Sequence, residues 1–152
     1  MKFKNSFLNI ILVFCIFTTV ALAVTQNTGN NNMNTLNITP ATIESLKKFE
    51  KISKFNEREE HDYYPGAPDE TVRARCEKAI NQMVAELISG LPENPKKEYV
   101  LSTFAKHLKK LEMEDTEERE EACYYCEKIM EILSIESSDG VLNTWLYGFD
   151  PS

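Results

Sequence analysis

The sequence predicts an all-α protein, a compact bundle of four antiparallel helices followed by a short C-terminal helix. In five segments the apolar residues recur every three or four positions, which is the period of an amphipathic α-helix. No segment alternates apolar and polar residues with the period of two that is typical of a strand. Short polar turns separate most of these segments, and helices joined in this way lie antiparallel and bury their apolar faces against one another.

The first helix begins at Thr39, which can cap it, and Pro40 suits its first turn. The apolar residues that follow at helical spacing are Ile43, Leu46, Phe49, Ile52 and Phe55. We therefore expect the first helix to continue to Phe55. Residues 56–68 lose this pattern and contain two prolines, so they are predicted to form the largest internal loop.

The second helix is predicted to start at Asp69, a good N-cap residue, and to end at Gly90 and Pro92. Asn94 and Pro95 then open a third helix. The apolar residues of this third helix are Tyr99, Leu101, Phe104, Leu108 and Leu111.

The fourth helix should begin at Asp115, which forms a capping-box pattern with Glu118, and should continue to Leu133. Its acidic first turns suit a helix N-terminus and are interpreted as a solvated face. Ser137 or Ser138 can cap the short last helix, which carries four apolar residues before a stopping glycine. These residues are Val141, Leu142, Trp145, Leu146 and Gly148.

Residues 1–23 have the pattern of a signal peptide. Lys2 and Lys4 precede an apolar run over residues 7–22, and Ala21-Leu22-Ala23 has the small-x-small form of a cleavage site. An uncleaved membrane anchor is the alternative. After cleavage, residues 24–38 are predicted to be a flexible linker rich in Asn and Thr, and residues 39–152 a single helical domain.

The charge of the mature chain limits its partners. Without Lys2 and Lys4 it has 15 basic and 24 acidic residues, a net charge of −9. Such a surface repels nucleic-acid phosphates and anionic lipids, so neither nucleic acid nor a membrane is expected as a partner after cleavage. A protein partner with a basic surface is favoured.

Three cysteines remain once Cys15 has left with the signal peptide. Cys123 and Cys126 form a C-x-x-C pair on the fourth helix, and Cys76 lies on the second. Acidic neighbours raise thiol pKa values, which disfavours a redox role, and a zinc site lacks a second ligand pair. We expect buried thiols or one disulfide, with a redox pair or a metal site as alternatives, and no cofactor.

Two aromatic clusters are the candidate binding residues. Near the C-terminus these are Trp145 and Tyr147, with Asp139 and Asn143 as polar neighbours, and in the long loop they are Tyr63 and Tyr64. Packing over the open end of the bundle explains the same residues without any binding role. The two histidines, His61 and His107, have no nucleophile motif nearby, and His107 is predicted to lie on a helix surface.

The C-terminal half resembles a small bacterial family known only as a domain of unknown function. The segments that carry the resemblance are Tyr124-Tyr125 and residues 127–133, 135–140 and 142–148. The resemblance implies an α-helical single domain in a bacterium, where export leads to the periplasm or beyond. It implies no activity and no catalytic residues.

These observations lead to one functional hypothesis with two alternatives. The hypothesis is an exported acidic helical binding protein of the bacterial cell envelope, such as an inhibitor or immunity factor for a basic protein partner. The first alternative is an envelope hydrolase that uses carboxylates of the helical core. The second is a thiol or metal protein built on Cys76, Cys123 and Cys126. The sequence leaves the oligomeric state open.

Overall fold

The computed structural model describes residues 34–59 and 63–149, which belong to one compact unit. The predicted signal peptide with Cys15, residues 24–33 of the predicted linker, and His61 lie outside the described residues. The elements, in chain order, are α1 (Pro40–Lys51), α2 (Glu70–Gly90), α3 (Lys97–Leu108), the 3-10 turn η1 (Lys109–Leu111), α4 (Thr116–Leu133) and α5 (Val141–Tyr147). The described part of the chain contains two isolated β-bridges and no strand, so the predicted all-α class is confirmed.

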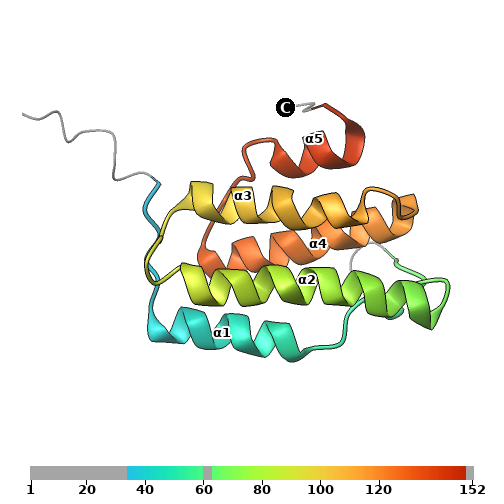
Figure 1. Cartoon of the computed structure of the whole chain (residues 1–152), viewed down its shortest axis with the longest axis horizontal. Coiled ribbons are helices and arrows are strands. Elements are labelled where there is room, and N and C mark those ends of the chain that lie inside the picture. The colour runs from blue at the N-terminus through green and yellow to red at the C-terminus, as the bar shows by residue number, and fades with distance from the viewer. Residues whose placement is uncertain (1–33, 60–62, 150–152) are drawn as a thin grey trace, which may run out of the picture. The chain divides into compact units, whose positions relative to one another are not determined.

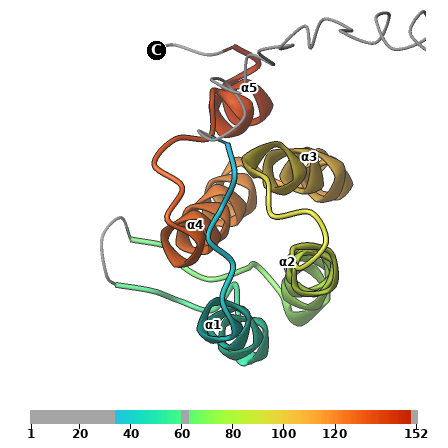
Figure 2. The ribbon, with the colours of Figure 1, turned by 90° about the vertical axis from the view of Figure 1, so that its left-hand side faces the viewer.

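The first four helices run alternately in opposite directions, as predicted for an antiparallel bundle (Figure 1). α2 packs against α1, α3 and α4, and α4 also packs against α1. Viewed from the end, the four helices surround a common interior, and α5 lies over α3 and α4 (Figure 2). Among the described residues, no helix is both long enough and apolar enough to cross a bilayer.

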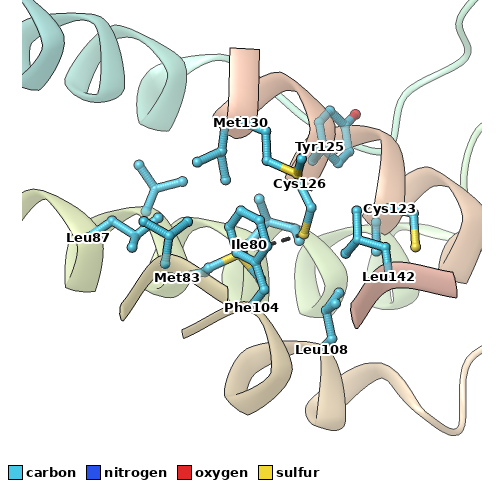
Figure 3. Close-up of a cluster of buried hydrophobic side chains, with 14 of the residues drawn as sticks. Ile80, Met83, Leu87, Phe104, Leu108, Cys123, Tyr125, Cys126, Met130 and Leu142 are labelled. Atoms are coloured by element: carbon cyan, nitrogen blue, oxygen red, sulfur yellow. Dashed lines mark hydrogen bonds between the residues drawn. The ribbon is translucent and has the colours of Figure 1, made fainter. Parts of the chain in front are cut away.

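The core lies mainly between α2, α3 and α4, and Figure 3 shows the side chains that meet there. Met83 of α2 and Cys126 of α4 bring their sulfur atoms to 3.9 Å. Phe104 of α3 is fully buried against this layer. Since each of these side chains comes from the predicted apolar face of its helix, burial of those faces accounts for the bundle.

The first helix is shorter than predicted, because it ends at Lys51 and not at Phe55. The buried Lys54 folds its ammonium group back onto the end of α1, where Nζ donates to the carbonyl oxygens of Phe49 at 2.8 Å and Ile52 at 3.0 Å. These bonds satisfy carbonyls that a longer helix would have bonded itself. Phe55 takes a left-handed backbone conformation, with φ of 59°, and inserts its ring into the core.

The predicted flexible linker does not extend to residues 34–38. The amide of Leu36 donates to the carbonyl of Pro95 at 2.7 Å, and that of Lys97 donates to the carbonyl of Asn34 at 2.9 Å. Leu36 and Ile38 pack against the core. Packing of these two apolar side chains against the core offsets the conformational entropy that is lost when the segment is ordered. The polar residues around them supply no such burial.

Two predicted helix starts are also corrected. α3 begins at Lys97 and not at Asn94-Pro95, because the residues before it are extended and pair with the segment around Leu36. α5 begins after Gly140, whose φ is 77°, and neither serine caps it. Instead, the hydroxyl of Ser137 accepts from the amide of Asp139 at 3.0 Å and shapes the turn before the helix.

Candidate functional site

An open cavity of about 360 Å³ lies between the loop after α1, the first half of α4 and the end of α5. Its lining is dominated by acidic and tyrosine side chains. The lining residues are Arg58, Tyr63, Tyr64, Pro65, Glu117, Glu120, Glu121, Cys123, Tyr124, Glu127, Leu146 and Tyr147. We refer to it as the acidic cavity.

The loop side of the acidic cavity is held by backbone hydrogen bonds. Arg58 and Tyr64 bond each other twice through their main chains, at 2.9 and 3.0 Å, so the two sides of the loop are paired. Nearer α1, the amide of Phe55 donates to the hydroxyl of Tyr125 at 2.8 Å. The loop is thus attached to α4 by a buried bond, and this attachment positions Arg58 and Tyr64 over the helix.

Arg58 is the basic side chain in the lining, and its charge is already paired. Its guanidinium donates to the carboxylate of Glu121 at 2.8 Å, and Glu121 is only 2% exposed. The same guanidinium stacks 3.9 Å from the centre of the Tyr124 ring. Because a buried ion pair of this kind is fixed in place, Arg58 acts as a wall of the cavity with its charge neutralised.

Glu118 lies one turn before Glu121 and is also buried. The hydroxyl of Tyr64 donates to its carboxylate at 3.3 Å. Burial raises the pKa of Glu118, and the neighbouring charges of Asp115 and Glu117 add to this effect. The prediction of a wholly solvated acidic face is therefore wrong, since Glu118 and Glu121 face the loop. The predicted capping box is also absent, because the Asp115 side chain makes no cap bond.

Three further carboxylates in the lining are exposed and make no ion pair within the described part of the chain: Glu117, Glu120 and Glu127. Desolvation raises the pKa of Glu127, and the charge of Glu131 adds to it. A nearby positive charge would stabilise the charged form of such a carboxylate. The cavity therefore has an excess of negative charge that residues 34–59 and 63–149 leave unpaired.

The structure separates the predicted aromatic candidates. Tyr63, Tyr64 and Tyr147 line the acidic cavity together. Trp145 and Asp139 lie on the other side of α5, in a shallow hollow shared with α3, where Asp139 is paired with Lys97 at 2.6 Å.

Asn143 faces a third hollow, next to Ile135 and Glu136. The predicted C-terminal patch is therefore not one surface.

Trp145 serves to attach α5 to the bundle. Arg119 of α4 donates to the carbonyls of Trp145 at 2.7 Å and Leu146 at 3.0 Å, and its guanidinium lies 5.0 Å from the Trp145 ring centre. Leu142 is buried below. For Trp145, this is the packing role that the sequence left open as the alternative to binding.

The three described cysteines are free, buried thiols. Burial raises the pKa of Cys76 and of Cys123 to about 12, and that of Cys126 is also raised by burial. Cys123 borders the acidic cavity, but a thiol with such a pKa is a poor nucleophile at neutral pH. Among residues 34–59 and 63–149, no group of three His, Cys, Asp or Glu side chains is arranged to hold a metal ion.

His107 is buried and not on the helix surface as predicted. Its Nε2 lies 2.8 Å from the carboxylate of Glu86 on α2, and its Nδ1 lies 3.2 Å from Nζ of Lys110. Because Lys110 can only donate, this geometry places the ring proton on Nε2. His107 therefore joins α3 to α2.

The α4 residues that line the cavity and were not among the predicted candidates share a simple signal. Glu117, Glu120, Glu121, Tyr124 and Glu127 are three or four positions apart and so lie on one face of a helix. Arg58, which completes the wall, carries no such signal, because its place depends on how the loop folds.

The fold and the cavity define a class of protein: a small all-α bundle whose loop and fourth helix enclose an acidic, tyrosine-lined cavity. The chain belongs to the DUF4844 family, a domain of unknown function, whose match covers residues 37–150. No curated protein matches the chain.

A solved structure is similar to this chain. It is the crystal structure of a DUF3571 family protein from Acinetobacter baumannii, with 26% sequence identity and a TM-score of 0.64. The match covers 71% of this chain and 89% of that chain. The predicted resemblance to an uncharacterised helical family is confirmed.

Proposed function

We propose that the protein is an exported binding protein of the bacterial cell envelope, which holds a basic side chain of a protein partner in the acidic cavity. The observation that carries this proposal is the set of carboxylates of Glu117, Glu120 and Glu127 around a cavity of about 360 Å³, which form no ion pair with any residue that the structure describes. An inhibitor or immunity factor for a basic enzyme is a biological role of this kind.

The chemistry of the lining suits a lysine or arginine side chain. Carboxylates form charge-assisted hydrogen bonds with ammonium and guanidinium groups, and tyrosine rings attract cations over their faces. Tyr63 and Tyr147 are 66% and 56% exposed, so their rings are free to contact a partner. The paired Arg58 gives no net repulsion to an incoming cation.

A carboxylate hydrolase gains less support from the same site. That alternative needs two acidic side chains with different pKa values that converge on one cavity. Glu127 lines the acidic cavity with a raised pKa but is exposed to solvent, and Glu121 lines it but is paired with Arg58. Glu118, whose pKa is raised by burial, is absent from the lining and bonded to Tyr64. The geometry therefore favours binding over acid-base catalysis.

The proposal is tested by capture of partners from an envelope extract. The immobilised protein should retain a basic protein at low ionic strength and release it at about 1 M salt, where charges are screened beyond ~3 Å. A triple variant should lose this capture, and a second triple variant with the same change in charge should keep it. The cavity changes are Glu117→Gln, Glu120→Gln and Glu127→Gln, and the control changes are Glu44→Gln, Glu93→Gln and Glu112→Gln.

Equal capture by both triple variants would contradict the proposal, as would capture that does not depend on salt. Export is tested separately by fractionation and by the mass of the recovered chain. A chain that begins at Val24 and is found outside the cytosol supports the leader; an intact chain in the cytosol would overturn it.

A further inference from the structure

A second cavity, of about 380 Å³, adjoins the acidic cavity and has a largely apolar lining. It lies between the end of α1, the start of the loop and the second half of α4. The apolar and aromatic residues in its lining are Phe49, Ile52, Tyr124, Tyr125 and Ile132. We refer to it as the apolar groove.

Ile52 is the residue that makes this groove unusual. It follows α1 in an extended conformation and is 50% exposed, although its position in the sequence pattern belongs to the apolar face of the helix. Because Lys54 ends α1 early, Ile52 is turned out of the core and into the wall of the groove. A large aliphatic side chain left half exposed in a concave surface gains free energy when a partner covers it.

The acidic cavity and the apolar groove share two lining residues, Arg58 and Tyr124. The stack of the Arg58 guanidinium on the Tyr124 ring separates them. A short segment of a partner that crosses this stack meets carboxylates on one side and apolar side chains on the other.

The charges around the apolar groove accept a basic segment. Its two basic residues, Arg58 and Lys128, are both in ion pairs, with Glu121 at 2.8 Å and with Glu131 at 2.9 Å. Glu57 is a further acidic residue in the lining. No unpaired lysine or arginine in the described lining therefore repels a basic partner, while the neighbouring acidic cavity attracts it.

We infer that the acidic cavity and the apolar groove form one binding surface for a peptide segment of the protein partner that carries a basic residue and, within a few positions, a large aliphatic residue. This inference rests on the proposed function and deepens it. The carboxylates select a basic residue. The apolar groove adds the requirement for a large aliphatic residue nearby, which charge alone does not impose.

The test uses four fluorescein-labelled hexapeptides and their fluorescence anisotropy with the purified protein. One contains Arg and Leu separated by one glycine, the second contains only Arg, the third only Leu, and the fourth neither. The peptide with both residues should bind about tenfold more tightly than the Arg-only peptide, because burial of one leucine side chain gives at least this much. Ile52→Ser should remove the tenfold gain, whereas Met113→Ser, at an exposed residue that lines neither cavity, should leave it unchanged.

The outcomes separate the two proposals. If the Arg-only peptide binds and needs the cavity carboxylates, but Leu adds nothing, the inference is overturned and the proposed function stands. If neither Arg peptide binds, both fail. If the wild-type protein forms a dimer that Ile52→Ser dissociates, a second copy of the chain covers the groove and the inference is overturned.

Discussion

Tyr125 illustrates how one buried hydroxyl fixes the site. Its Oη accepts the amide proton of Phe55 at 2.8 Å, and Phe55 is the residue whose left-handed backbone turns the chain away from α1. The rings of Phe55 and Tyr125 also pack edge to face, with centres 5.1 Å apart. Both interactions determine where the loop with Arg58 and Tyr64 begins.

Tyr125→Phe should therefore destabilise the protein. The variant leaves the buried amide of Phe55 without an acceptor, and such a loss costs about 1–3 kcal/mol. In urea unfolding, the midpoint should fall to a lower urea concentration, while the dependence of the unfolding free energy on urea concentration stays unchanged. Tyr147→Phe, which removes a hydroxyl at an exposed position, is the matched control, and equal midpoints for the two variants would contradict the assignment.

Glu118 gives a prediction about pH. Its pKa in the folded protein is raised by burial, so the folded state disfavours the charged form and loses stability as the pH rises through that pKa. Glu118→Gln keeps an acceptor for the Tyr64 hydroxyl and removes the charge. The free energy of unfolding should therefore exceed that of the wild type at pH 7, with the gain disappearing below the usual glutamate pKa of about 4.3.

Unfolding curves at pH 4 and pH 7 measure this gain. Glu93→Gln, an exposed loop position, controls for the loss of one negative charge. A Glu118→Gln variant that is less stable than the wild type at pH 7 would contradict this prediction, because it would show that the folded state stabilises the charged carboxylate.

The thiols give a chemical test of burial. Cys76, Cys123 and Cys126 should not react with an aromatic disulfide reagent in the folded protein, because they are buried and burial raises their pKa values. All three should react once the protein is unfolded in urea. A titration that finds fewer than three thiols after unfolding would indicate a disulfide and contradict the structure.

The contact between α2 and α3 depends on the absence of a side chain at Gly90. A Cβ there would lie 2.0 Å from Oη of Tyr99, whose hydroxyl donates to the carbonyl of Glu86 at 3.1 Å. Tyr99 can therefore approach the last turn of α2 only because that turn contains glycine. The sequence predicts that this glycine stops the helix. The structure shows a second role, because the absence of a side chain at Gly90 leaves room for the Tyr99 ring.

Gly90→Ala should destabilise the protein by about 1–3 kcal/mol, the usual cost of forcing an extra methyl group into a packed contact. This loss would occur although alanine is the better helix former by about 1 kcal/mol. Thermal unfolding measures it, with the neighbouring exposed Ser89→Ala as control. A stabilised Gly90→Ala variant would show that Tyr99 moves aside at no cost.

The helices themselves were predictable, because their signals are local. Asp69 caps α2 as predicted, with its carboxylate accepting from the amides of Thr71 at 2.7 Å and Val72 at 2.9 Å. The end of α1 was not predictable from spacing, since it depends on the folded-back ammonium group of Lys54, which also bonds Asn81 of α2 at 2.7 Å. Helix ends follow the spacing of apolar residues only where no side chain folds back to bond the terminal carbonyls.

The acidic cavity was only partly predictable for a similar reason. Tyr63, Tyr64 and Tyr147 are aromatic residues near loops, but nothing local indicates that the first two meet the third. Their meeting is a property of the whole bundle, because the loop after α1, the helix α4 and the end of α5 line the same cavity. The spacing along α4 predicts which carboxylates lie on one face of the helix. It does not predict that Glu121 is buried while Glu120 is exposed, because this difference depends on the loop that covers Glu121.

For the molecule as a whole, charge and shape act together. A net charge of −7 over the full chain, or −9 without residues 1–23, favours basic partners in general. Under the proposed function, the acidic cavity specifies where one basic side chain binds. General attraction alone would give contacts spread over many acidic positions. A built cavity gives contacts concentrated at one place, and this difference can be measured.

The most direct measurement is a titration of the ¹⁵N-labelled protein with the Arg-only hexapeptide, followed by amide chemical shifts at low ionic strength. We predict that the largest changes fall on the residues that line the acidic cavity. On α4 these are Glu117, Glu120, Glu121, Cys123, Tyr124 and Glu127, and elsewhere they include Tyr63, Tyr64, Leu146 and Tyr147. Changes spread evenly over the acidic surface, or concentrated in the hollow beside Trp145 and Asp139, would contradict binding in the cavity.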